Sequence, residues 1–137
     1  MALFRLMGID FGEVRIGIAL SDPLQIISQP YLVIPNNDDT ISKIQKIIKT
    51  EEVGKIILGL PLNLDGEDTK KTLEVREFFE MLTNNVDIPV TFWDERYTSV
   101  EANEQLKKMG YSIAESRKVI DKVAASIILK NYMENQA

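Results

Sequence analysis

The order of strand-like and helix-like segments is the feature that most restricts what this chain can fold into. Two apolar, β-branched runs come first, at Leu3–Phe11 and Val14–Ser21, and the short turn Gly12–Glu13 separates them. Strands joined by so short a turn pair antiparallel as a hairpin. A third short strand is expected at Tyr31–Ile34, which lies between two prolines. Because proline lacks a backbone donor, we expect this strand at an edge of the sheet.

Further along the chain, helical and strand-like segments alternate. The expected elements, in chain order, are a helix capped by Asp38 or Asp39, a strand at Lys55–Pro61, an amphipathic helix from about Thr69 to Asn84, a strand at Ile88–Trp93, a short helix from Thr98 to near Gly110, and a longer helix from Ser112 to near Asn131. Strands that are reached through helices pair in parallel, so the strand at Lys55–Pro61 should lie parallel to the first strand. The order predicts an α/β fold in one domain, residues 1–137, with a mixed five-stranded sheet and helices on both faces.

The composition removes several kinds of chemistry. The 137 residues include no cysteine and no histidine, which excludes disulfides, thiolate zinc sites, Ser-His-Asp triads and imidazole-ligated metals. The formal charge of −5 argues mildly against a protein held on nucleic acid by charge alone, although two bound divalent ions would offset most of it. No segment has the pattern of a signal peptide or a membrane span, so we expect a cytoplasmic protein with no membrane partner.

Carboxylates stand out where apolar elements end. Asp10 lies near the end of the first strand, Asp94 and Glu95 follow a later strand, and Asp121 lies on the last helix. Asp121 shares a helix side with two alanines, which would let the helix approach a sheet closely. Each acid alone could instead be structural, since Asp121 could pair with a lysine and Asp94 or Glu95 with Arg96. Together they could converge on one point.

Converging carboxylates would suit one kind of chemistry that needs neither histidine nor cysteine. Oxygen ligands favour Mg²⁺ or Mn²⁺. Two such ions bridged by a carboxylate can activate water and stabilise the leaving oxygen of a phosphodiester. The acids therefore indicate a candidate metal site for phosphodiester hydrolysis.

Four stretches of the chain resemble the motifs of the bacterial YqgF/RuvX family. They are GIDFGEVRIGIALSD (Gly8–Asp22), GLPLNLDG (Gly59–Gly66), DERYTSVEA (Asp94–Ala102) and IDKVAASIIL (Ile120–Leu129), in the family's order and spacing. The resemblance implies an RNase H-like fold and a metal-dependent nuclease, described both as a Holliday-junction resolvase and as the enzyme that matures the 5′ end of 16S ribosomal RNA. It also implies that Asp10, Glu95 and Asp121 are the catalytic, metal-binding acids of a two-ion Mg²⁺ or Mn²⁺ site. Whether Asp94 also contributes stays open, although only one of Asp94 and Glu95 can point fully into the site, because adjacent strand residues face opposite ways.

Six cationic residues are candidates for binding phosphate. They are Arg15, Arg96, Lys70, Lys71, Lys107 and Lys108. An arginine fork can bind phosphate through two donors, and the start of a helix favours an anion. The other reading is structural: Arg96 could order a neighbouring acid, and the lysines could lie on solvated helix faces.

Three glycines near the start of the chain and the single tryptophan are expected to have structural roles. Gly8 and Gly12 would allow close backbone approach or a tight turn, and we attribute Gly17 to hairpin geometry alone. Trp93 is expected to pack in the core. Both expectations can be checked directly against the fold.

Other classes of protein remain as alternatives. GIDFG at Gly8–Gly12 also resembles the phosphate loop of actin-like ATPases and sugar kinases, but those proteins need two such domains and a later glycine-rich adenosine motif. A non-catalytic nucleic-acid-binding module would not need all three acids. The sequence does not distinguish a ribosomal RNA precursor from branched DNA as substrate. A symmetric cut of a junction would require a homodimer.

Overall fold

The computed structural model describes residues 3–95, 107, 108, 110 and 113–135, with the backbone alone described for 113–120. Five strands form one sheet in the order β3-β2-β1-β4-β5. The strands are β1 (Arg5–Asp10), β2 (Arg15–Ser21), β3 (Ser28–Pro35), β4 (Val53–Leu60) and β5 (Val90–Asp94). The helices are α1 (Thr40–Thr50), α2 (Lys70–Asn85) and α4 (Ile113–Glu134).

The sheet is mixed, as the order of elements predicts. β1 and β2 form an antiparallel hairpin, and β3 adds antiparallel to β2 at the edge. β1 and β4 pair in parallel, and so do β4 and β5. β3 is longer than predicted, because it includes both prolines. Pro30 lies opposite Ala19, where the register of the β2–β3 pair shifts, and an edge strand or a bulge is where a sheet tolerates proline.

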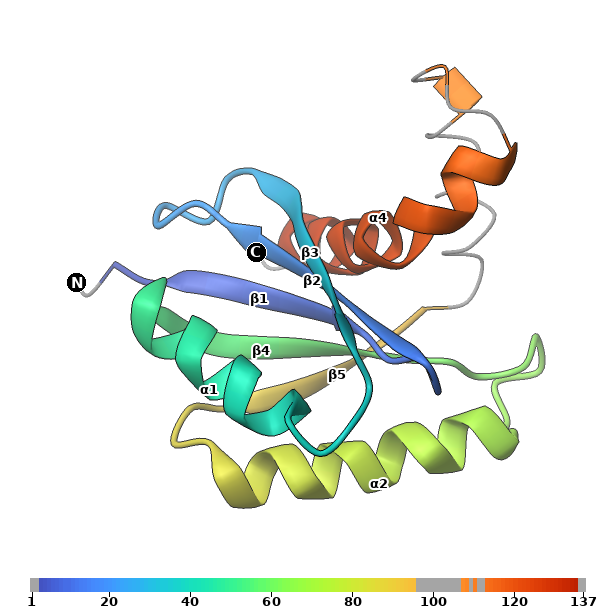
Figure 1. Cartoon of the computed structure of the whole chain (residues 1–137), viewed down its shortest axis with the longest axis horizontal. Coiled ribbons are helices and arrows are strands. Elements are labelled where there is room, and N and C mark those ends of the chain that lie inside the picture. Colours follow the sequence, from blue (N-terminus) through green and yellow to red (C-terminus); the bar gives the residue numbers. More distant parts are fainter. Residues whose placement is uncertain (1–2, 96–106, 109, 111–112, 136–137) are drawn as a thin grey trace.

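Helices cover both faces of the sheet, and each face has its own core (Figure 1). On the side of α1 and α2, inward-facing residues such as Met7 and Ile9 of β1 join Ile44 and Phe78. On the side of α4, Leu6 joins a cluster that contains residues of β2, β4 and the helix. Successive residues of β1 therefore serve opposite faces, as the pleat of a strand requires.

Helix α4 lies unusually close to the strands because two glycines are beneath it. A Cβ placed on Gly8 would lie only 2.7 Å from the carbonyl oxygen of Ala125. A Cβ on Gly17 would collide with the backbone carbonyl of Asp121. The attribution of Gly17 to hairpin geometry alone was therefore wrong, since this glycine leaves room for a helix that is more than 100 residues away along the chain.

Local sequence signals account for the starts of α1 and α2 but not for the end of α4. Asp39 is the N-cap residue of α1, as predicted, but its side chain makes no capping hydrogen bond. Thr69 caps α2 in a capping box with Thr72. α4 extends to Glu134, beyond the predicted end near Asn131. The predicted starts at Thr98 and Ser112 lie outside the described residues.

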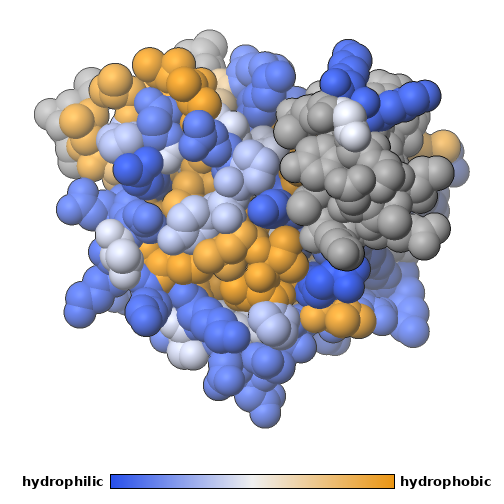
Figure 2. All heavy atoms as spheres, turned by 45° about the horizontal axis from the view of Figure 1, so that its top comes forward, coloured by the Kyte–Doolittle hydropathy of each residue, from blue (hydrophilic) through white to orange (hydrophobic). Residues whose placement is uncertain are grey.

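Trp93 packs against the core on the α4 side, as predicted. Its ring meets the ring of Tyr132 edge-on, with the centroids 5.6 Å apart. Figure 2 shows that hydrophobic surface is also exposed in separate areas, between hydrophilic ones. The exposed apolar residues include Leu24, Ile26 and Ile27, which follow β2. Within the described part of the chain, no helix has the length and hydrophobicity to cross a membrane.

We expect Gly17→Ala to lower the free energy of unfolding by about 1–3 kcal/mol, because the added methyl group would push α4 away from the sheet. Gly54→Ala is a comparison variant. Its Cβ would meet the Cβ and Cγ atoms of Phe4, so it should also lose stability, but by displacing Phe4 and without pushing α4 from the sheet. Urea unfolding of both variants measures the difference. Equal stability of Gly17→Ala and wild type would contradict the close-packing argument.

Candidate active site

Three of the sequence-predicted acids lie on the face of the sheet that α4 covers. Asp10 ends β1 and lies opposite Gly17 of β2 in the hairpin. It is two residues after Gly8, so its side chain points to the same face, toward α4. Glu95 follows β5 two residues after Trp93, which packs on that face. Its backbone N–H donates to the Leu60 carbonyl oxygen at 3.1 Å, which continues the β4–β5 pairing.

The choice between Asp94 and Glu95 is decided by the pleat of β5. Asp94 is exposed at the end of the strand. Glu95 points inward, over the strand that ends in Gly59 and Leu60. A Cβ on Gly59 would collide with the Glu95 carboxyl group and with Ile128 of α4. Gly59 therefore makes the space that the Glu95 side chain occupies, and this role was missed from the sequence.

The carboxyl groups of Asp10 and Glu95 share a hydrogen bond. Burial is the main cause that raises the pKa of Glu95 to about 8, and the charge of Asp10 raises that pKa further. Burial also raises the pKa of Asp10 to about 6. Near neutral pH the Glu95 carboxyl is therefore mainly protonated, and it donates to the Asp10 carboxylate. Two carboxyl groups this close cannot both ionise without a compensating cation.

Asp121 approaches the same pair from α4. Its negative charge contributes to the raised pKa of Asp10. The Asp121 carboxylate accepts a hydrogen bond from Nε of Arg15 at 3.1 Å, and the two side chains are 21% and 55% exposed. The described ion pair of Asp121 is thus with Arg15 on β2. Arg15 keeps a half-exposed guanidinium that can still meet an anion.

Lys71 is the predicted phosphate-binding residue whose charge acts on the pair of Asp10 and Glu95. It is exposed in the first turn of α2, and its positive charge lowers the pKa of both Asp10 and Glu95. Lys70, its neighbour, instead acts on Glu74 of the same helix, whose pKa it lowers. The first turn of α2 therefore directs its two lysines toward different acidic groups.

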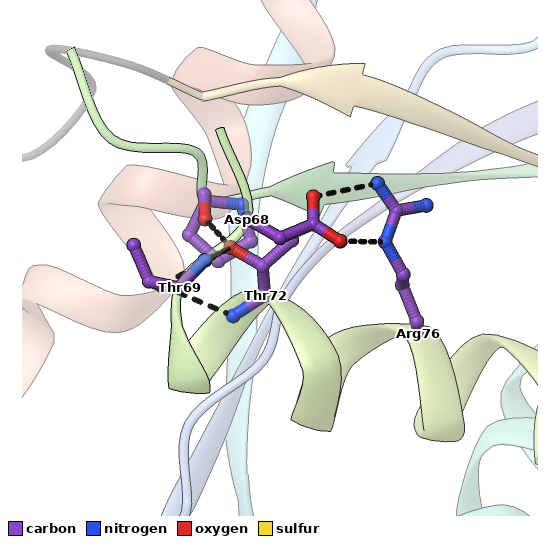
Figure 3. Close-up of polar contacts among 5 residues, drawn as sticks. Asp68, Thr69, Thr72 and Arg76 are labelled. Carbon is purple, nitrogen blue, oxygen red and sulfur yellow. Dashed lines mark hydrogen bonds and ion pairs between the residues drawn. The ribbon is translucent and has the colours of Figure 1, made fainter. Parts of the chain in front are cut away.

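The position of Lys71 depends on how α2 begins (Figure 3). The Thr72 hydroxyl donates to the Pro61 carbonyl oxygen, which ties the helix to the end of β4. Asp68 accepts two hydrogen bonds from the Arg76 guanidinium, each 2.9 Å long. In the preceding loop, the Asn63 side chain accepts from two backbone N–H groups. Asn63 thus has a structural role in this loop.

No described contact joins Lys107 or Lys108 to the acids. Lys107 and Lys108 are exposed and helical, and Arg96 lies outside the described residues. Within the described part of the chain, no three acidic side chains form a ready-made metal-binding group. The carboxyl groups of Asp10 and Glu95 share a hydrogen bond, whereas the nearby Asp121 carboxylate forms an ion pair with Arg15. The donor set is entirely carboxylate oxygen, which fits Mg²⁺ or Mn²⁺ in its chemistry.

Comparison with known proteins places this arrangement in a family. The model of the RuvX family, described as Holliday junction resolvase, matches residues 4–135. A protein of Maridesulfovibrio salexigens named "Putative pre-16S rRNA nuclease" is 43% identical over 131 residues, which cover 94% of this chain and 97% of that protein. A protein of the same name from Thermoanaerobacter pseudethanolicus is 42% identical over 135 residues, with 96% and 97% covered.

Solved structures share the fold at low sequence identity. RuvC of T. thermophilus, solved in complex with a Holliday junction substrate, has a TM-score of 0.61 at 10% identity, and 96% of this chain and 97% of that chain are covered. The Fowlpox virus resolvase, solved with Holliday junction DNA, has a TM-score of 0.58 at 13% identity with the same coverage. The mixed sheet and its helices are thus those of the RuvC-like, RNase H-fold resolvases, as the sequence predicts.

We expect the metal-free protein to lose stability as the pH rises from about 4 to about 8. The pKa values of Asp10 and Glu95 are raised in the folded state, so folding favours their protonated forms. That stabilisation is complete below the unfolded pKa values and is lost as the pH passes the folded ones. Thermal unfolding in EDTA across this range measures it. Asp10→Asn should flatten the curve, and an unchanged curve would contradict the carboxyl pair.

Proposed function

Because this chain belongs to the RuvX family, we propose that it is a metal-dependent nuclease that hydrolyses phosphodiester bonds in structured nucleic acid. The observation that carries this proposal is the buried pair of Asp10 and Glu95, with Asp121 beside it and Lys71 at the start of α2. Residues 1–137 act as one nuclease domain. The leading substrate is the precursor of 16S ribosomal RNA, since the two relatives described above are named as nucleases of that RNA. Such a substrate would place the protein in the cytoplasm.

Asp10, Glu95 and Asp121 are the residues that would hold the metal. Bound Mg²⁺ or Mn²⁺, in a two-ion site, would supply activation of water and stabilisation of the leaving oxygen. The raised pKa values of Asp10 and Glu95 support this assignment, because a cation would relieve the cost of ionising two adjacent, buried carboxyl groups. Perturbed acids in one place are typical of functional sites.

The cations around the acids would position the substrate. Lys71 is exposed and close enough to influence both acids, so a phosphate group held by its amine would lie beside them. Arg15 pairs with Asp121 through Nε, and the rest of its half-exposed guanidinium can donate to a phosphate oxygen. Arg96, which follows Glu95 in the sequence, would bind a phosphate or order a neighbouring acid, and Lys107 and Lys108 would contact the nucleic-acid backbone.

The second candidate function is resolution of Holliday junctions. The description of the family supports it directly. The shared fold with two junction resolvases shows that this architecture can carry such an activity, but at 10% and 13% identity it shows the fold alone. Symmetric cleavage of a four-way junction would need two copies of this chain acting together.

We expect Asp10→Asn to reduce cleavage by several powers of ten, as happens when one member of a group that acts together is removed. The variant should fold, and it should be at least as stable as wild type without metal, because the Asp10 charge, which is partly buried and repelled by Asp121, is removed. Cleavage of pre-16S RNA and of a synthetic four-way junction, each with Mg²⁺ and with Mn²⁺, measures the effect and identifies the substrate.

Asp39→Asn is the matched control for this variant. Asp39 is exposed and its side chain makes no capping hydrogen bond, so the same chemical change there should leave cleavage unchanged. Calorimetric titration with Mn²⁺ in the absence of nucleotide should detect binding to wild type and weaker binding to Asp10→Asn. Wild-type cleavage by Asp10→Asn would end the proposal, and a metal site that needs nucleotide would favour an ATPase.

We expect replacement of Lys107 and Lys108 by alanine to weaken nucleic-acid binding without changing the cleavage step. Each lost phosphate contact should make the plot of the logarithm of the binding constant against the logarithm of the salt concentration less steep by about 0.7 to 0.9. Lys49→Ala is the control. That exposed lysine lies on α1, which covers the face of the sheet opposite to α4 and to the candidate active site. An unchanged salt slope in the double variant would remove the two lysines from the nucleic-acid interface.

A further inference from the structure

A second concave site lies on the other side of the sheet from α4, between the first turns of α1, the β1–β2 turn and the middle of α2. Figure 1 shows these segments on the side of the sheet that α2 covers. The cleft has a volume of about 560 Å³. Phe11 lines it immediately after Asp10, so the cleft adjoins the candidate active site along the chain but opens on the opposite face.

We call the apolar part of the cleft lining its floor and the acidic part its rim. Phe78 of α2 packs against Phe11, with ring centroids 4.9 Å apart. Ile41 of α1 and Met81 of α2 also line the cleft, and Met81 is 52% exposed. An exposed methionine beside aromatic rings is an adaptable surface for an apolar side chain of a ligand.

The rim of the cleft is acidic. Glu13, Asp38, Glu74 and Glu77 line it, and no lysine or arginine is among the residues that do so. Glu74 has a carboxylate oxygen, Oε2, that is buried and has no hydrogen-bond partner in the described part of the protein. The Glu74 carboxyl group lies against that of Glu13, and two ionised carboxylates supply no donor to each other.

The acids on this rim repel one another. Burial is the main cause that raises the pKa of Glu74, and the charge of Glu13 raises it further, while Lys70 offsets part of the effect. Glu77 adds to the repulsion. A cation placed in the cleft would relieve this repulsion and supply a donor to the unpaired Glu74 oxygen.

We propose that this cleft binds a basic, amphipathic segment of a partner protein, which places an apolar side chain on the Phe11–Met81 floor and arginine or lysine on the acidic rim. Charge complementarity selects this occupant. A nucleic acid would be repelled by the rim, and a small polyamine would leave the apolar floor uncovered. The inference stands independently of the nuclease chemistry, because it uses none of the residues assigned to that site.

The test uses the full chain labelled with ¹⁵N and a short peptide in which arginines flank one leucine. We expect the peptide to bind at low salt and to shift the backbone resonances of Glu13, Ile41 and Met81. Two matched peptides separate the contribution of the apolar side chain from that of the positive charges. One carries serine in place of leucine, and the other carries glutamate in place of arginine. Both should bind at least about tenfold more weakly, and spermidine should compete poorly.

Variants of α2 provide the controls within the protein. Glu74→Gln combined with Glu77→Gln should weaken peptide binding about tenfold, whereas Glu80→Gln, on the same helix and outside the cleft, should not. Met81→Ser should weaken binding, and Leu73→Ser, a comparably exposed residue that does not line the cleft, should leave it unchanged. Circular dichroism checks that each variant is folded.

The proposal is overturned by any of three results. The first is that the peptide fails to bind wild type at low salt. The second is that the Glu74→Gln/Glu77→Gln variant binds the peptide as tightly as wild type does. In the third result, the serine peptide or spermidine binds as tightly as the leucine peptide, which would show attraction by charge without use of the cleft.

Discussion

The contact between helix α4 and the sheet is the constraint on which the rest of this structure depends. Gly8 and Gly17 place no side chain beneath the helix, so the backbone of α4 around Asp121 and Ala125 lies almost directly on β1 and β2. This depth puts the Asp121 carboxylate within reach of Arg15 and of the charge on Asp10. A larger residue at either glycine would separate the helix from the strands and the acids from one another.

The close packing has an electrostatic cost, because it buries carboxyl groups beside one another. An ionised carboxylate without a partner is expensive in a protein interior. Here the cost is reduced by a proton shared between Asp10 and Glu95 and by the charge of Lys71. Apart from this pair and the acidic cleft on the other face, local signals agree with the fold: α2 is capped and each face of the sheet has a filled core. A group that conflicts with its surroundings in such a fold marks a site with a function.

Much of the fold was predictable because it follows from short-range patterns. The hairpin, the edge position of the proline-flanked strand, and the parallel pairing of β1 with β4 all follow from turn length, proline chemistry and crossover rules. The alternation along β5 also separates Asp94 from Glu95 without reference to the rest of the chain. The ends of elements were less predictable, since α4 continues three residues past Asn131 where packing against the sheet supports it.

The sequence by itself determined which residues carry the chemistry: without histidine or cysteine, the acids at element ends were the candidates that remained. It also determined that only one of Asp94 and Glu95 can point into a site, since adjacent residues of a strand face opposite ways. Only the tertiary structure decided that Gly17 serves α4, that Gly59 makes room for Glu95, and that Asp121 pairs with Arg15. The physical reason is distance along the chain, because residues up to 106 positions apart meet only when the helix settles on the sheet.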